Sequence, residues 1–184
     1  GWLPGSRKCD LAVIKCKNYT HQTRYQLPIP PSPNLPNMKS IYLYPSTCFF
    51  EATPVSLGRG TSLPFQVYGH PNMTGYNYSF TPRSIPGAKN PPQLNKLCHG
   101  VDLSNMSDEE IWKRGVDLTY VIDAYRNLNL DDHFFRPFFE LLVGRDYVRK
   151  MIKEGKSADE IKAMWKGDVE KFKAQRKPYL LYEE

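Results

Sequence analysis

Hydrophobic and polar positions alternate in short segments over roughly the first hundred residues. Each segment is bounded by proline, glycine or asparagine, which interrupt regular structure. A period of two places side chains on alternate faces of a strand, so these segments predict short strands with one buried face. We expect strands at 11–19, 41–44, 65–68, 76–80 and 97–103.

Apolar residues recur at helical spacing after residue 107. Ser107 and Ser157 each stand three residues before a glutamate, an arrangement in which the hydroxyl and the carboxylate each satisfy a free backbone N–H. Asp146 is expected to cap a short helix by the same kind of contact. The predicted helices are 107–128, 146–155 and one from 157 to just before Pro178, and residues 179–182 are expected to fold back onto the core.

Fourteen of the sixteen prolines lie in the first 92 residues, so the two halves of the chain are expected to differ. The segment 27–36 lacks the backbone donors of a strand ladder, and we expect an ordered, extended connector; a flexible linker is the alternative. The order of elements predicts an α+β fold with a short mixed or antiparallel sheet, long proline-rich loops, and three or more helices packing on the sheet. At 184 residues the chain is expected to form a single domain, 1–184.

The net charge of +6 raises the question of a polyanionic partner. Residues 1–40 carry six basic and one acidic side chain, residues 41–144 eight and ten, and residues 145–184 eleven and eight. The charges of the last segment interleave on predicted helices, as on a solvated helix face, so we expect no nucleic-acid binding. An anionic substrate, including a cell-wall sugar with carboxylates, fits the same charge. No apolar run approaches the ~20 residues that cross a bilayer, so no transmembrane segment is expected.

Four cysteines, at 9, 16, 48 and 98, are too few and too scattered for a disulfide framework. A Cys48–Cys98 disulfide and free thiols are the two alternatives. The chain has no C-x-x-C pair and no histidine spacing typical of metal ligands, so we expect neither a metal site nor a cofactor. Gly1 is typical of the residue left when a fusion tag is removed, so 1–10 are expected to be a cloning remnant and lead-in.

Residues 48–61 combine the features of a functional site. Glu51 follows two phenylalanines, and no other acidic residue lies within forty positions of it. Burial there would favour the protonated carboxyl that a general acid needs. Arg59 lies between two glycines, which let the backbone turn sharply and present the guanidinium to a carboxylate. The structural alternative is that Glu51 and Arg59 pair with each other and pin a loop, and composition alone favours it.

Four further residues, two within this segment and two beyond it, are candidate ligand contacts. Ser56 and Thr61 supply hydroxyls, either for a sugar or for capping the turn. His70 stands at a strand end, where it either lines a cleft or is a plain loop histidine. Tyr78 is either a sugar-stacking residue or part of the sheet face. The glycine spacing fits neither a phosphate-binding loop nor a dinucleotide motif.

A set of motifs runs in a fixed order along the chain. The most specific is E-x-T-x-x-S-x-G-R-G-T at 51–61. The others are PPSPNLP at 30–36, YPSTC at 44–48, PF at 64–65, Gly69, FTP at 80–82, CHGV at 98–101 and RKPYLLY at 176–182. In these motifs the chain resembles the C-terminal domain of NamZ-type exo-β-N-acetylmuramidases, and the resemblance covers about residues 28–182.

The resemblance implies a bacterial enzyme of cell-wall recycling, periplasmic or secreted, that releases terminal N-acetylmuramic acid from the non-reducing end of peptidoglycan glycans. It also implies a Rossmann-like N-terminal domain as a partner, with the substrate cleft between the two domains. For the site it implies that Glu51 is catalytic and that Arg59 binds the lactyl carboxylate of the sugar. Ser56, Thr61, His70 and Tyr78 are the remaining candidate substrate contacts.

Glycoside hydrolysis usually requires two carboxylates. Glu51 is the first candidate and Asp102 a distant second, and the other alternative is a carboxylate in the N-terminal domain. This chain alone is therefore expected to be inactive. The competing interpretation is a non-catalytic saccharide-binding or structural lobe, with the chemistry in the other domain.

Overall fold

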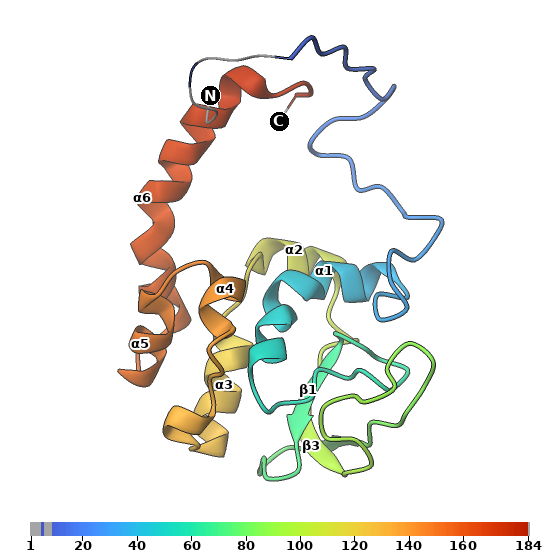
Figure 1. The fold of residues 1–184 in the computed structure, drawn as a ribbon, viewed down its shortest axis with the longest axis vertical. Coiled ribbons are helices and arrows are strands. Elements are labelled where there is room, and N and C mark those ends of the chain that lie inside the picture. The colour runs from blue at the N-terminus through green and yellow to red at the C-terminus, as the bar shows by residue number, and fades with distance from the viewer. Residues whose placement is uncertain (1–4, 6–8, 184) are drawn as a thin grey trace. The chain divides into compact units, whose positions relative to one another are not determined.

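The computed structural model describes residue 5 and residues 9–183, and these divide into two compact units (Figure 1). One unit is Gln26–Gly167, and the other is the described part of Gly1–Tyr25 together with Asp168–Glu184. Most of the predicted lead-in at 1–10 lies outside the described residues. The prediction of a single domain stays a prediction.

A three-stranded antiparallel sheet lies in the larger unit. Its strands are β1 (Val67–His70), β2 (Tyr78–Phe80) and β3 (Cys98–Asp102), in the order β1-β3-β2. Gly100 is required at the centre, because a Cβ there would lie 1.9 Å from the carbonyl oxygen of Tyr68 on the neighbouring strand. The last three predicted strands are confirmed: β1 is displaced by two residues from the predicted 65–68, and β2 and β3 are shorter than predicted.

The predicted strand at 41–44 is wrong, because this segment lies within helix α1 (Met38–Thr47). Asn37 caps the helix by accepting a hydrogen bond from the N–H of Ser40, whose hydroxyl in turn bonds the backbone of Asn37. The buried residues Ser40, Leu43 and Thr47 follow at helical spacing, and this pattern outweighs the alternation of tyrosines. The helix continues directly into a 3₁₀ helix, η2 (Cys48–Ala52), so Glu51 lies in a helical turn and not in a loop.

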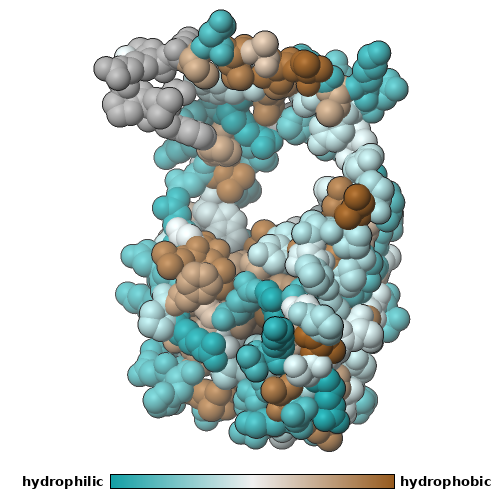
Figure 2. Space-filling model, turned by 45° about the vertical axis from the view of Figure 1, so that its right-hand side comes forward, coloured by the Kyte–Doolittle hydropathy of each residue, from teal (hydrophilic) through white to brown (hydrophobic). Residues whose placement is uncertain are grey.

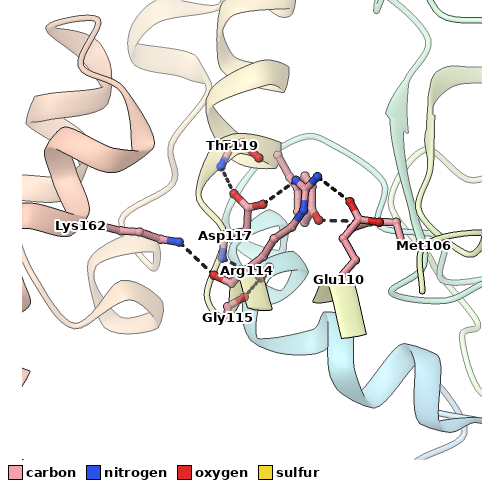
Figure 3. A network of polar contacts seen from close by, with 9 residues as sticks. Met106, Glu110, Arg114, Gly115, Asp117, Thr119 and Lys162 are labelled. Atoms are coloured by element: carbon pink, nitrogen blue, oxygen red, sulfur yellow. Dashed lines mark hydrogen bonds and ion pairs between the residues drawn. The ribbon is translucent and has the colours of Figure 1, made fainter. Parts of the chain in front are cut away.

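The helix predicted over 107–128 is two helices, α2 (Asp108–Arg114) and α3 (Thr119–Leu128). The break follows from Gly115, which ends α2 with a φ of 59°. Asp117, almost fully buried, stabilises the connection: its carboxylate accepts from the N–H of Thr119 at 2.8 Å and from Arg114 at 3.1 Å. Arg114 lies between Asp117 and Glu110 (Figure 3), so one guanidinium ties the end of α2 to the start of α3.

The C-terminal third is helical. It contains η3 (Asp131–His133), α4 (Phe139–Val143), α5 (Tyr147–Lys153), α6 (Ala158–Arg176) and η4 (Lys177–Tyr179). The two helices predicted there are confirmed as α5 and α6, and η3, α4 and η4 were not predicted. The capping box of α6 is confirmed, because Glu160 accepts from the N–H of Ser157 and donates its own N–H to the serine hydroxyl. Asp146 occupies the N-cap position of α5, but its side chain makes no capping hydrogen bond.

The main core of the larger unit runs from α1 through the helices of the second half. Its largest fully buried side chains include Phe50, Phe65, Phe134 and Phe139. The sheet joins this core through Tyr68, whose ring packs against Phe50 of η2 and Tyr120 of α3. The other face of the sheet has a small cluster of its own, formed by Val67, Phe80 and Cys98. Helices therefore cover one face of a short sheet, which confirms the α+β prediction.

In the smaller unit, residues 9–25 contain no strand, so the strand predicted at 11–19 is wrong. Leu11 and Ile14 are 72% and 96% exposed, because no neighbouring segment of the described chain pairs with them. Tyr182 packs edge-on against Tyr19 at 4.9 Å, and its hydroxyl accepts from the N–H of Cys16. Tyr182 thus contacts residues between 16 and 21, and Tyr179 and Leu181 stay exposed, contrary to the predicted return of 179–182 to the core.

The face of the molecule drawn in Figure 2 carries hydrophobic patches among hydrophilic side chains. No helix in the described residues is both long enough and apolar enough to span a membrane. All four cysteines are free thiols, so the Cys48–Cys98 disulfide is absent.

Candidate functional site

Glu51 is held at the surface by a buried helical turn. Phe49, Phe50 and Ala52 of η2 are buried, and only Glu51 and Cys48 of this turn are partly exposed. The side chain of Glu51 is 25% exposed. The buried neighbours of Glu51 therefore hold its backbone in place, and its carboxylate lies at the edge of solvent.

Arg59 is presented by a glycine turn that no other residue type fits. Gly58 and Gly60 have φ of 84° and 81°, in the left-handed region that favours glycine. A Cβ on Gly60 would lie 2.4 Å from the carbonyl oxygen of Arg83, and one on Gly58 would lie 2.4 Å from that of Leu63. Both glycines are needed for conformation and for close packing, which explains the G-R-G sequence.

Glu51 and Arg59 form an ion pair, in which Nη2 of Arg59 donates to Oε1 of Glu51. The guanidinium also lies over the ring of Phe65, 5.1 Å from its centroid. The contact that sequence reasoning treated as the structural alternative is therefore present. Each side chain is a quarter to a third exposed, so the pair lies at the surface.

Ser56 and Thr61 shape the turn that carries Arg59. Ser56 is fully buried, its hydroxyl accepts from the N–H of Gly58 at 3.4 Å, and its backbone pairs with Gly69. The hydroxyl of Thr61 donates to the carbonyl of Gly58 at 2.7 Å and accepts from the N–H of Leu63 at 3.0 Å. Both hydroxyls are engaged within the protein.

The sheet separates His70 from Tyr78. The antiparallel register pairs His70 with His99 and Tyr78 with Gly100, so the two side chains belong to adjacent rows and project from opposite faces. Burial, and after it the charge of Lys96, lowers the pKa of His70. Burial and the nearby Asp102 raise the pKa of Tyr78. These two candidates do not share one binding surface.

Asp102, the second candidate carboxylate, ends β3. Its Oδ1 accepts the N–H of Ser104 at 2.8 Å, which is a local turn contact. It shares a side of the sheet with Tyr78. No contact between Asp102 and Glu51 occurs among the described residues.

Tyr44 contacts the ring that lies beneath Arg59 and was not among the site residues predicted from the sequence. It is 38% exposed on α1, and its ring lies 5.0 Å from that of Phe65, the ring beneath Arg59. The signal that would have found it is spacing: Tyr44, Cys48 and Glu51 follow at intervals of four and three, one face of a helix. The mistaken strand at 41–44 concealed this pattern.

Two surface pockets lie elsewhere on the larger unit. One, of about 460 Å³, is lined by α3 residues including Asp123 and Arg126, and the other, of about 420 Å³, by apolar residues including Tyr42 and Trp112. Neither is lined by Glu51 or Arg59. No group of three or more histidine, cysteine or acidic residues in the described part of the chain is arranged to hold a metal ion.

Comparisons with known proteins agree on one family. The family model described as exo-beta-N-acetylmuramidase NamZ, C-terminal, matches residues 42–182. The peptidoglycan beta-N-acetylmuramidase NamZ of Bacillus subtilis (strain 168) is 32% identical over 94% of this chain and 46% of its own length. The crystal structure of a DUF1343 family protein from Bacteroides fragilis is 82% identical, with a TM-score of 0.96 over the whole of this chain and 52% of that one. A second DUF1343 structure from the same species, 22% identical over 97% of this chain and 52% of that one, has the same fold with a TM-score of 0.69.

Proposed function

The chain belongs to the family of the C-terminal domain of exo-β-N-acetylmuramidase NamZ, and from this premise we propose that it forms one wall of the substrate cleft of a glycoside hydrolase. The enzyme would release terminal N-acetylmuramic acid from the non-reducing end of peptidoglycan fragments. The observation that carries the proposal is the partly exposed Glu51–Arg59 pair, built by the most specific motif of the chain.

The proposal assigns Arg59 to the lactyl carboxylate that distinguishes N-acetylmuramic acid from other amino sugars. Only Nη2 of Arg59 is used in the contact with Glu51, so the guanidinium keeps further N–H donors for a second carboxylate. The ring of Phe65 holds the group in place from below. Ser56 and Thr61 contribute by fixing the turn. Direct contacts of His70 and Tyr78 with the substrate stay predictions.

Glu51 is assigned to the reaction through its position beside Arg59. A carboxylate that an arginine holds at the edge of solvent can act as a general base, as a nucleophile or as a group that stabilises positive charge. Because Glu51 accepts a hydrogen bond from Arg59, we assign the general acid, which the sequence placed at Glu51, to a second carboxylate. We place that carboxylate in the other half of the protein, because Asp102 has only a local turn contact.

The chain spans about half the length of the relatives that it matches. We therefore propose that a Rossmann-like N-terminal domain completes the cleft, and that hydrolysis requires the full-length protein. Peptidoglycan lies outside the cytoplasm, so a periplasmic or secreted enzyme acting in cell-wall recycling is part of the proposal.

The second candidate function is a non-catalytic saccharide-binding or structural lobe. The pairing of Glu51 with Arg59 favours it, since positioning the arginine is by itself a sufficient role for such a carboxylate. In that case Arg59 recognises the sugar and the chemistry belongs entirely to the other domain.

The test is the hydrolysis of 4-nitrophenyl β-N-acetylmuramide by the full-length protein and its Glu51→Gln and Arg59→Ala variants. A catalytic Glu51 predicts a loss of about 10²- to 10⁴-fold in kcat for Glu51→Gln with the fold intact. A role of Arg59 in binding predicts a raised KM with nearly unchanged kcat. Turnover of Glu51→Gln close to that of the wild type would assign the chain to the second candidate function.

A further inference from the structure

Tyr44 and Glu51 lie on one side of a continuous helical run. Helix α1 passes directly into η2, and the N–H of Cys48 bonds the carbonyl of Tyr44, so the run is unbroken between them. Intervals of four and three residues place Tyr44, Cys48 and Glu51 along one face. Tyr44 is the most exposed of the three.

The ring of Phe65 contacts both Tyr44 and Arg59. Its ring is buried and contacts the ring of Tyr44 at 5.0 Å with a tilt of 50°, while the guanidinium of Arg59 lies 5.1 Å from its centroid. Phe65 has a φ of 60°, a left-handed conformation that is strained for a bulky side chain. Hydrogen bonds from its N–H to Leu57 and from Thr47 to its carbonyl hold it there. Such held strain is typical of functional sites.

The phenol of Tyr44 stays neutral in this position. Burial raises its pKa, Glu51 and Cys48 raise it further, and the charge of Arg59 opposes them in part. Tyr44 therefore offers an apolar ring with a neutral hydroxyl at its tip, next to a carboxylate and a guanidinium.

A pyranose matches this arrangement. Its axial C–H groups form an apolar face that packs on an aromatic ring, and its hydroxyl and acidic substituents project at the edge, where charged groups can bind them. We infer that Tyr44 is the ring on which the sugar of the substrate stacks, with the substituents of that sugar directed to Glu51 and Arg59. The inference rests on the proposed function and adds the residue that recognises the sugar ring itself.

The test is the steady-state kinetics of the full-length protein with 4-nitrophenyl β-N-acetylmuramide. Tyr44→Ala should raise KM about three- to tenfold with kcat within about twofold, because stacking binds ground state and transition state alike. Tyr44→Phe keeps the ring and should retain the KM of the wild type. Tyr179→Ala, at a tyrosine that is 65% exposed and outside the site, is the matched control.

A second measurement covers the case in which Tyr44→Ala loses its fold. In saturation-transfer NMR of the wild type with N-acetylmuramic acid, irradiation of aromatic protons should saturate the ring protons of the sugar more than its acetyl methyl group. An unchanged KM in folded Tyr44→Ala, or saturation strongest at the acetyl group, would overturn the stacking role and leave the proposed function standing. Absence of hydrolysis by both the wild type and Tyr179→Ala would overturn the two together.

Discussion

Tyr68 of β1 donates its hydroxyl hydrogen to Asp123 of α3 across 2.7 Å, and this contact ties the sheet to the helical half of the larger unit. The same carboxylate oxygen accepts from Tyr76 at 2.8 Å. The ring of Tyr68 stacks on Phe50 at 4.9 Å, one residue before Glu51. The carboxylate of Asp123 thus supports, through one buried ring, the turn that carries the proposed catalytic residue.

Replacing Asp123 should destabilise the fold strongly. Asp123→Ala leaves two tyrosine hydroxyls without their acceptor, one of them on the buried Tyr68, and we expect a loss of about 3 kcal/mol in the free energy of unfolding. Urea unfolding of the wild type and Asp123→Ala measures this loss. Asp132→Ala is the control, since Asp132 is 83% exposed and should show no measurable change. Equal stabilities of the two variants would contradict the role of Asp123.

The glycine turn predicts a difference between two alanine substitutions. Gly60→Ala adds both left-handed strain and a collision with the carbonyl of Arg83, whereas Gly144→Ala, at a φ of 71° in open space, adds strain alone. We expect losses of about 3 kcal/mol or more and about 1 kcal/mol respectively. Thermal and urea unfolding give both values. Similar losses would mean that Gly60 is required only for its conformation.

The candidate site was predictable where a motif carried it. Glu51 and Arg59 were selected because an isolated acid and a glycine-flanked arginine share one short run, and the structure places them in contact. Tyr44 was not selected as a site residue, because the alternating tyrosines at 42 and 44 indicate a strand when they are considered without the cap at Asn37. Helical spacing and strand alternation coincide over so few residues, and only the cap and the packing of Leu43 decide between them.

Other errors arose from contacts that a sequence does not specify. The apolar residues at 11–14 have the composition of a strand, yet a strand needs a neighbour to accept its hydrogen bonds, and no described segment provides one. The division of α2 from α3 at Gly115 depends on the buried network of Asp117 and Arg114, which joins groups whose pairing appears only in the fold. The capping box of Ser157 was predictable because both partners lie within four residues.

The buried carboxylate of Asp117 should make the free energy of unfolding fall in acid. Burial alone would raise its pKa, but hydrogen bonds from Thr119 and the charge of Arg114 outweigh burial and hold the pKa below its usual value. Because the unfolded chain binds this proton more readily, ionised Asp117 stabilises the fold above the unfolded pKa of about 4. That stabilisation is lost as the pH falls through the lower folded-state pKa.

The corresponding measurement is urea unfolding of the wild type and Asp117→Asn between about pH 2.5 and 7. The free energy of unfolding of the wild type should exceed that of Asp117→Asn by a constant amount above about pH 5, and this difference should shrink below about pH 4. Glu110→Gln removes the exposed partner of the same arginine and should show a much weaker pH dependence. A stability difference between the wild type and Asp117→Asn that grows on acidification would contradict the stabilising role of the ionised Asp117.

The Glu51–Arg59 pair should contribute little to stability, and this separates its proposed role from a structural one. Both side chains are partly exposed, and ion pairs of this kind are worth about 0.2–1 kcal/mol. A double-mutant cycle of Glu51→Gln and Arg59→Ala, followed by urea unfolding, should therefore give a coupling energy of at most about 1 kcal/mol.

Leu57→Ala, at a buried position of the same segment, is the control. It should lower the free energy of unfolding by about 2–5 kcal/mol, which shows that the assay detects a structural contribution here. A coupling energy above about 3 kcal/mol would mean that the pair exists chiefly to hold the loop. With a small coupling energy, any large fall in turnover of Glu51→Gln reports on the reaction and not on the fold, because the turn beneath it is stabilised by Phe49, Phe50 and Ala52.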